Sequence, residues 1–223
     1  MNTIAIDTVT QLLSVTAAGP AGTCTVSLEN KIQHAETLIG VLETAIAHAG
    51  FSPTETERIL CAEGPGSFTG LRIAYSTAKA IQLASSCPLL PIPTLLCYAY
   101  PFRFSNGTVV SILDAKKSRF YAQLFKKGKP LTEELDCTPD ELVAILKTHD
   151  SILLTGPDAP LFQNAVESSL SALDYILIPY GNQGISQNMI HIALQDSEQY
   201  TQNIYDYAGP RYVRKSDAET KHG

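Results

Sequence analysis

The chain has 223 residues, of which 44% are hydrophobic and 17% are charged. This composition is typical of a folded globular protein and excludes intrinsic disorder, and the length allows one large domain or two small ones. The formal net charge of −6 argues against the chain holding a nucleic acid by itself, because that affinity comes largely from Lys and Arg that replace counterions along the phosphates.

Targeting and membrane signals are not found in the sequence. No stretch reaches the roughly 18 to 20 consecutive apolar residues that a membrane helix needs. Residues Met1–Thr8 lack a basic segment followed by an apolar run, so we do not predict secretion. A cytoplasmic location is expected.

The five cysteines are an odd number, lie far apart and form no C-x-x-C pair. Neither a disulfide framework nor a zinc knuckle is therefore predicted. We expect reduced and mostly buried thiols. They are Cys24, Cys61, Cys87, Cys97 and Cys137.

A small basic cluster lies near the end of the chain, at Arg211, Arg214, Lys215 and Lys221. Two interpretations are open. The cluster is either a solvated tail, which is the ordinary case, or a segment that touches RNA within a larger assembly.

The first half of the chain predicts the order strand, strand, strand, helix, strand, helix. Apolar residues recur at helical intervals up to the stop signal Gly50, and turn residues separate the strands. The predicted strands are Thr3–Asp7, Leu12–Ala17, Cys24–Leu28 and Arg58–Ala62, and the predicted helices are His34–Ala49 and about Leu71–Ser86.

The second half restarts with strands and then alternates helix and strand. Two linked α/β lobes account for this order, joined near Pro88–Phe104, with the first at 1–100 and the second at 101–223. The predicted strands are Leu89–Ile92, Thr108–Asp114, Arg119–Phe125, Ile152–Leu154 and Tyr175–Ile178, and the predicted helices are Thr94–Tyr100, Pro139–Lys147, Pro160–Ser169 and Ile185–Asp196.

Four motifs together give the most specific signal. They are Ile4–Thr8, the glycine-rich run Gly64–Ile73, Asp114-Ala115 and Pro210–Arg214. With these motifs the chain resembles, over nearly its whole length, the TsaB (YeaZ) family of bacterial tRNA threonylcarbamoyladenosine (t6A) modification proteins. That family is part of the TsaD/Kae/Gcp glycoprotease-like superfamily.

The resemblance implies an actin-like, ribonuclease-H-like α/β fold with two lobes, the second smaller and degenerate. It also implies a non-catalytic scaffold that supports a TsaD-type catalytic paralogue together with a TsaE-type ATPase, and that reaches tRNA only indirectly. A homodimer is expected when the partner is missing.

Metal chemistry has little support in the residues. The catalytic relatives hold a metal through an H-x-x-x-H pair on one helical face, whereas Thr94–Tyr100 contains no histidine here. No H-E-x-x-H is present, and Ser67 lacks the G-x-S-x-G setting of a nucleophile elbow. We therefore predict no metal site and no catalytic residue. A metallopeptidase or a small ATPase of the same fold is the alternative.

Nucleotide binding meets a similar difficulty. Actin-like ATPases use glycine-bearing hairpin turns to bring backbone N–H groups against phosphates. The turns Asp7–Thr10 and Asp114–Lys117 contain no glycine, and Leu154–Asp158 retains one. We expect no cofactor on this chain alone, and the sequence leaves open a nucleotide at the boundary with a partner.

Five residues are candidates for a vestigial phosphate site: Asp7, Ser67, Thr69, Arg72 and Asp114. The aspartates could instead cap turns, and the loop that contains Ser67 and Thr69 is either an anion cradle or, as we favour, a tight turn with one of them capping the next helix. Arg72 could reach a phosphate or a partner carboxylate, although an exposed helical arginine is the default.

A partner surface is expected on the first two helices. In the first, Ile39 and Ile46 widen the apolar stripe, and in the second Lys79 is the only charge between Ile73 and Ser86. Such helices are usually covered on more than one side. The alternative is that both are internal. The predicted partner residues are Leu38, Val41, Leu42, Ile46, Ala74, Ala78 and Ile81.

Overall fold

The computed structural model describes residues 1–29, 34–171, 173–181, 183–195, 209–211 and 213. Two compact units are present. The first consists of Met1–Thr94 with Asn182–Tyr212, and the second of Leu95–Gly181 with Val213–Gly223. Of the basic residues near the chain end, Arg214, Lys215 and Lys221 lie outside the described residues.

The first unit is built on a five-stranded sheet in the order β3-β2-β1-β4-β5. The first three strands pair antiparallel as consecutive hairpins, and β4 and β5 add to β1 in parallel. The strands are β1 (Thr3–Asp7), β2 (Leu12–Gly19), β3 (Gly22–Glu29), β4 (Arg58–Ala62) and β5 (Leu89–Ile92).

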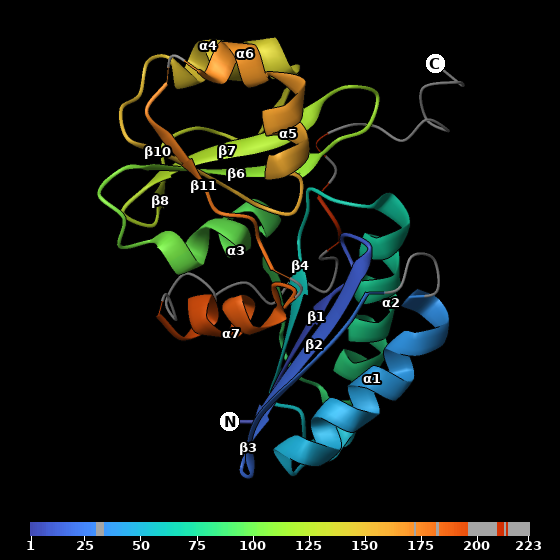
Figure 1. The fold of residues 1–223 in the computed structure, drawn as a ribbon. Helices are drawn as coiled ribbons and strands as arrows, with labels where there is room; N and C mark the ends of the chain where they lie inside the picture. Colours follow the sequence, from blue (N-terminus) through green and yellow to red (C-terminus); the bar gives the residue numbers. More distant parts are fainter. Residues whose placement is uncertain (30–33, 172, 182, 196–208, 212, 214–223) are drawn as a thin grey trace. The chain divides into compact units, whose positions relative to one another are not determined.

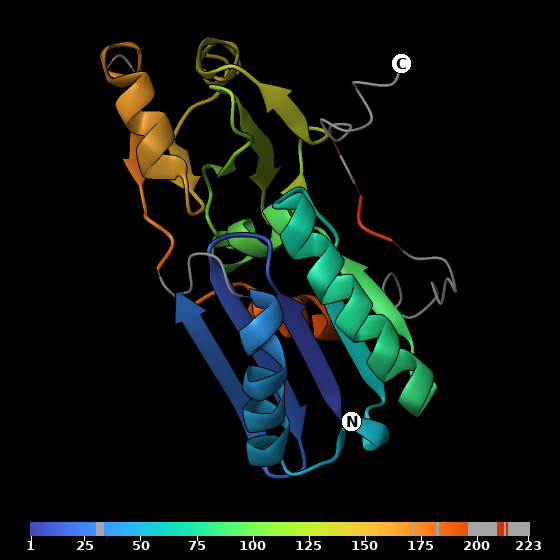
Figure 2. The same cartoon turned by 90° about the vertical axis from the view of Figure 1, so that its right-hand side faces the viewer.

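Helices cover both faces of this sheet. α1 (His34–Ala49) and α2 (Phe68–Ser85) lie side by side on one face, and α7 (Ser186–Gln195) lies on the other (Figures 1 and 2). Because side chains alternate along a strand, β1 sends Ile4 and Ile6 toward α1 and α2. The predicted bounds of α1 are confirmed, and the helix is followed by Gly50, whose φ of 81° is the left-handed conformation that glycine adopts just after a helix C-terminus.

The second unit contains a sheet in the order β11-β10-β6-β7-β8, with β9 also paired to β7. Its core lies between one sheet face and the short helices that follow β9 and β10, and it is centred on residues such as Phe120, Leu142 and Phe162. The strands are β6 (Thr108–Asp114), β7 (Phe120–Lys126), β8 (Lys129–Pro130), β9 (Leu135–Cys137), β10 (Ile152–Thr155) and β11 (Tyr175–Leu177). The helices are α3 (Thr94–Ala99), α4 (Pro139–Leu146), α5 (Ala159–Ala165) and α6 (Glu167–Leu170). The described residues also contain the 3-10 turns η1 (Pro53–Glu55), in the first unit, and η2 (Tyr100–Phe102), in the second.

The two sheets repeat one topology. In each, a first strand (β1 or β6) pairs antiparallel with the strand after it, and in parallel with the first strand that follows a helix (β4 or β10). Asp7 and Asp114 are the last residues of the two equivalent first strands. The topology of the ribonuclease-H-like fold that the family resemblance implied is therefore present twice.

The division of the chain differs from the predicted lobes 1–100 and 101–223. α7 packs on β1, β2 and β4 of the first unit, so the chain returns to that unit after residue 181. This return could not be predicted, because the apolar residues of α7 indicate that one face of the helix is buried but do not indicate which sheet covers it. In the described part of the chain, no helix is long and apolar enough to cross a bilayer.

Candidate functional site

Asp7 is fully buried at the end of β1. Its carboxylate accepts hydrogen bonds from the backbone N–H of Val9, at 3.0 Å, and of Ile185, at 3.2 Å. Burial raises its pKa to about 6, and those two N–H groups, with the nearby His34 and the Ser14 hydroxyl, act in the opposite direction. The carboxylate is thus occupied by the chain's own backbone at the segment that leads into α7.

Buried hydroxyls beside Asp7 join the sheet to the start of α7. The Ser186 hydroxyl lies 2.9 Å from that of Ser14 and 2.8 Å from that of Thr16. Thr16 in turn lies 2.9 Å from Thr25 on β3. Since an unpaired buried hydroxyl is costly, these contacts fix where α7 begins. The group is a structural anchor, which we call the α7 anchor: Asp7, Ser14, Thr16 and Ser186.

Asp114 makes the same turn in the second unit. Its carboxylate accepts from the backbone N–H of Lys116 at 2.7 Å and pairs with the Lys116 ammonium at 2.6 Å. Its own N–H donates to Asp158 at 2.8 Å, and burial raises the pKa of Asp158. Each aspartate therefore accepts the N–H two residues ahead, which is the capping role that the sequence left as an alternative.

The glycine loop after β4 is packed closely against the chain itself. A Cβ at Gly66 would lie 2.7 Å from Val9 Cβ, and a Cβ at Gly70 would overlap the Thr8 carbonyl oxygen. The Thr8 hydroxyl also donates to the Gly70 carbonyl at 2.7 Å. The glycines are explained by these close approaches to the β1–β2 turn, which favours the tight-turn interpretation.

Ser67 is the N-cap of α2, and it is one of the two residues, Ser67 and Thr69, that were predicted to cap this helix. Its hydroxyl accepts from the Gly70 N–H at 3.2 Å, and its own N–H donates to the Val9 carbonyl at 2.9 Å. Thr69 is exposed, and the Arg72 guanidinium stacks 3.9 Å from the centre of the Phe68 ring. Of the five candidate phosphate residues, four belong to the first unit, and Asp114 belongs to the second.

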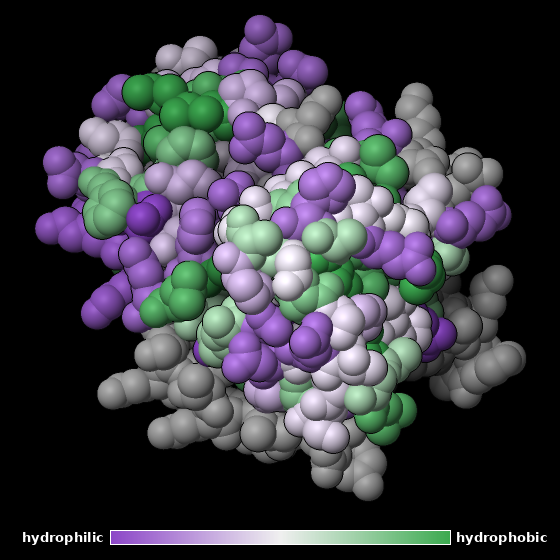
Figure 3. Space-filling view, turned by 90° about the horizontal axis from the view of Figure 1, so that it is seen from below, coloured by the Kyte–Doolittle hydropathy of each residue, from purple (hydrophilic) through white to green (hydrophobic). Residues whose placement is uncertain are grey.

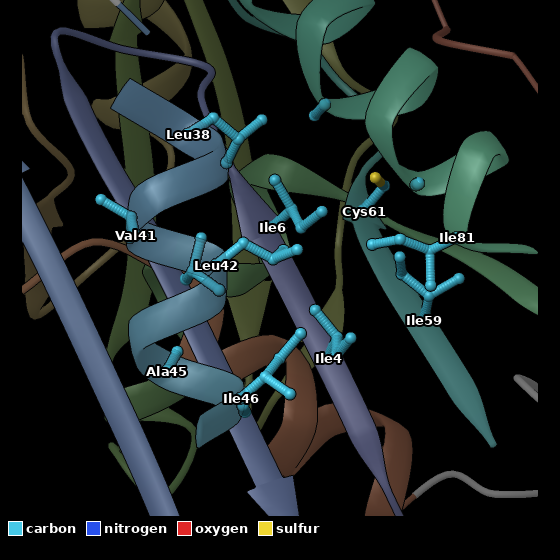
Figure 4. Close-up of a cluster of buried hydrophobic side chains, with 14 of the residues drawn as sticks. Ile4, Ile6, Leu38, Val41, Leu42, Ala45, Ile46, Ile59, Cys61 and Ile81 are labelled. Carbon is cyan, nitrogen blue, oxygen red and sulfur yellow. The ribbon is translucent and has the colours of Figure 1, made fainter. Parts of the chain in front are cut away.

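The predicted partner residues are inside the unit's own core. Figure 4 shows Leu38, Leu42 and Ile46 of α1 pointing toward β1, and Ile81 of α2 lying beside Ile59 of β4. Side chains this deep cannot form a surface while the fold is intact, which fits the alternative that these residues are internal. The seven residues, each at most 7% exposed, are Leu38, Val41, Leu42, Ile46, Ala74, Ala78 and Ile81.

The outward faces of α1 and α2 expose small and apolar side chains together with the charged residues Glu36, Glu43 and Arg72. Ile39 on α1 is 51% exposed and Leu83 on α2 is 84% exposed. We call the set the α1–α2 face. Its exposed residues include Ile39, Gly40, Thr44 and Ala47 on α1 and Ser76, Ala80, Leu83 and Ala84 on α2.

The cysteine side chains are free thiols. Four of the five thiols are buried and Cys24 is partly buried, and all five are free, as predicted. Across the described residues, no three His, Cys, Asp or Glu side chains are close enough to share a metal ion.

Comparison with known proteins shows the family to which the chain belongs. A family model described as tRNA N6-adenosine threonylcarbamoyltransferase (TsaD) matches residues 28–219. The chain belongs to this family. Among the curated proteins, the t6A biosynthesis protein TsaB of Bacillus subtilis is 24% identical over 86% of this chain and 84% of its own length. TsaB of Escherichia coli is 30% identical over 54% of this chain and 53% of its own length.

Solved structures of YeaZ share the fold of this family member. YeaZ from Pseudomonas aeruginosa superposes with a TM-score of 0.78 at 19% identity, covering 95% of this chain and 99% of its own. A P. aeruginosa protein with similarity to the peptidase YeaZ gives 0.79 at 19% identity, covering 96% and 99%. The predicted resemblance to TsaB (YeaZ) and the two-lobed, actin-like α/β fold are thereby confirmed.

Proposed function

We propose that this protein is a non-catalytic subunit of the bacterial t6A machinery that binds a TsaD-type catalytic paralogue through its α1–α2 face. Membership of the family and similarity to proteins named TsaB support the t6A role. In this proposal a TsaE-type ATPase joins the pair, tRNA is held by the assembly, and the free chain forms a homodimer through the same face. The site of action is the cytoplasm.

The observation that carries the proposal is that exposed hydroxyl groups on the α1–α2 face are already hydrogen-bonded within their own helices. Thr44 donates its hydroxyl to the Gly40 carbonyl at 2.7 Å, and Ser76 donates to the Ile73 carbonyl at 3.0 Å. Polar groups already bonded to their own helix lose little when a partner displaces water. Small side chains such as Ala47 and Ala80 let another helix approach closely.

Exposure of single apolar residues would not be enough by itself. Hydrophobic residues are scattered among hydrophilic ones on the face seen in Figure 3, which is ordinary for a protein surface. On the α1–α2 face, exposed apolar side chains occur together with small residues and with internally bonded hydroxyls on two adjacent helices. That coincidence favours a helix-packing interface.

The double substitution Ala47→Glu with Ala80→Glu tests the surface. Both alanines are exposed, so the fold should persist, whereas carboxylates buried without partners at an interface are strongly unfavourable. We expect the affinity for the paralogue to fall by at least about 30-fold, equivalent to about 2 kcal/mol. Co-purification and isothermal calorimetry would measure it.

Ala144→Glu is the matched control, because Ala144 is an exposed alanine on α4 of the second unit. It should bind the paralogue like the wild type. Equal affinity of all three proteins would exclude the α1–α2 face as the binding surface.

A further inference from the structure

Positive charge is concentrated in one segment of this acidic chain. Residues 103–129 contain seven of the 16 Lys and Arg residues and one of the 22 Asp and Glu residues, a formal charge of +6 against −6 for the whole chain. The seven are Arg103, Lys116, Lys117, Arg119, Lys126, Lys127 and Lys129. Such a local excess is typical of a segment that meets a polyanion.

The β6–β7 turn uses most of its charge internally. Lys116 is paired with Asp114 at 2.6 Å, and Arg119 is paired with Asp136 at 2.7 Å. Glu141 lies 3.9 Å from the same guanidinium. These cations are therefore already committed to carboxylates of the chain.

The β7–β8 hairpin, at the other end of β7, differs from the β6–β7 turn because its lysines are not paired with carboxylates of the described residues. Lys126, Lys127 and Lys129 are all exposed, and within the described residues none is in an ion pair. Lys126 is directly opposite Lys129 in the ladder. Like charges directly opposite one another destabilise an antiparallel pair, so an external anion would relieve this repulsion.

The turn of this hairpin carries a lysine where turn chemistry favours another residue. Lys127 and Gly128 are the two loop residues, with φ of 50° and 76°. Two-residue hairpins of this kind favour Asn-Gly or Asp-Gly, because Asn and Asp tolerate positive φ. A lysine there adds charge at a conformational cost, which points to a function for the charge.

An exposed aromatic ring, Phe104, follows Arg103, the residue that the hairpin tip contacts. A Cβ at Gly128 would lie 3.1 Å from Arg103 Cβ, so the hairpin tip rests on Arg103. The Arg103 guanidinium lies 4.1 Å from the centre of the Tyr100 ring and 4.3 Å from that of Phe104. Phe104 is 79% exposed although arginine stacking orients its ring.

We propose that Lys126, Lys127 and Lys129, with Arg103 and Phe104, form an RNA-binding surface, the lysine hairpin surface. The lysines contact the sugar–phosphate backbone, and an unpaired base stacks on Phe104. Lysines supply charge for phosphates and an exposed ring accepts any base face, which fits RNA better than an acidic peptide. The inference rests on the proposed function, in which the RNA is tRNA.

The test measures fluorescence anisotropy of an unmodified tRNA transcript with the purified full-length chain, alone and with the paralogue, between 50 and 200 mM salt. For the double variant Lys126→Gln, Lys129→Gln we expect about tenfold weaker binding at low salt. The slope of log K against log salt should decrease in magnitude by about 1.4, since each lost phosphate contact removes about 0.7.

Phe104→Leu separates stacking from charge. It should weaken binding about tenfold and leave the salt slope unchanged, because base stacking releases no counterions. The control double variant Lys117→Gln, Lys147→Gln removes the same charge from residues outside the lysine hairpin surface, and it should bind within about twofold of the wild type.

Several outcomes would overturn the inference. One is unchanged tRNA affinity in the hairpin variant, and another is an equal loss in the control. A third is a hairpin variant that keeps its tRNA affinity but loses affinity for the paralogue or for polyglutamate, which would make the surface a protein contact. Ala47→Glu with Ala80→Glu should leave tRNA binding by the free chain intact, so failure of the partner surface and failure of the RNA surface are distinguishable.

Discussion

At the scale of single residues, some glycines lie where two parts of the backbone come into close contact, and others do not. Gly70 stands against the Thr8 carbonyl, while Gly40 on α1 has open space around an added Cβ. The sequence shows both only as glycines. Their different roles could not be predicted, because they depend on contacts between segments that are far apart in the chain.

A pair of alanine substitutions checks this distinction. Gly70→Ala should destabilise the protein by about 3 kcal/mol or more, since the new methyl group overlaps a backbone oxygen that cannot move cheaply. Gly40→Ala should raise the free energy of unfolding by about 0.5 to 1 kcal/mol, because alanine favours a helix interior. Urea denaturation of both variants measures the difference, and equal effects would show that the close approach at Gly70 is unimportant.

At the scale of elements, nearly every helix and strand was predicted from the sequence. The predictions of which helix faces are exposed, and of which unit contains α7, were wrong. The apolar period of α1 is clear, yet residues such as Leu42 and Ile46 were read as a partner surface. They belong instead to the core of the first unit, together with Ile4 and Ile6 of β1. Periodicity reports that a face is buried without naming what buries it, and the same limit explains the missed return of α7 to the first unit.

The buried Asp7 carboxyl of the α7 anchor makes the stability of the first unit depend on pH. The pKa of Asp7 is about 6 in the folded state, above its ordinary value of 3.8, so the folded protein binds more protons than the unfolded chain between these values. The contribution of Asp7 to stability is therefore full below about pH 4 and is lost as the pH rises through 6.

Comparison with Asp7→Asn isolates this effect from other carboxyl groups. The free energy of unfolding of the wild type minus that of the variant should fall by roughly 2 to 3 kcal/mol from pH 4 to pH 7. Chemical denaturation at a series of pH values measures it. A difference that stays constant or rises with pH would show that the Asp7 carboxyl is not desolvated as the α7 anchor requires.

The whole molecule repeats one strand topology in two units and keeps an equivalent aspartate turn at the first strand of each. Both turns are now closed by the chain's own groups: Asp7 by Ile185, and Asp114 by Lys116. The two carboxylates are thus engaged by groups of the chain itself. This engagement supports the proposal that the chain contributes surfaces to an assembly and does no chemistry by itself.

The most direct test of this account is the t6A content of bulk tRNA, measured by mass spectrometry in cells depleted of this protein. We predict that t6A is lost on depletion and restored by the wild type and by Ala144→Glu, but not by Ala47→Glu with Ala80→Glu. Unchanged t6A after depletion, or full restoration by the double variant, would contradict the account.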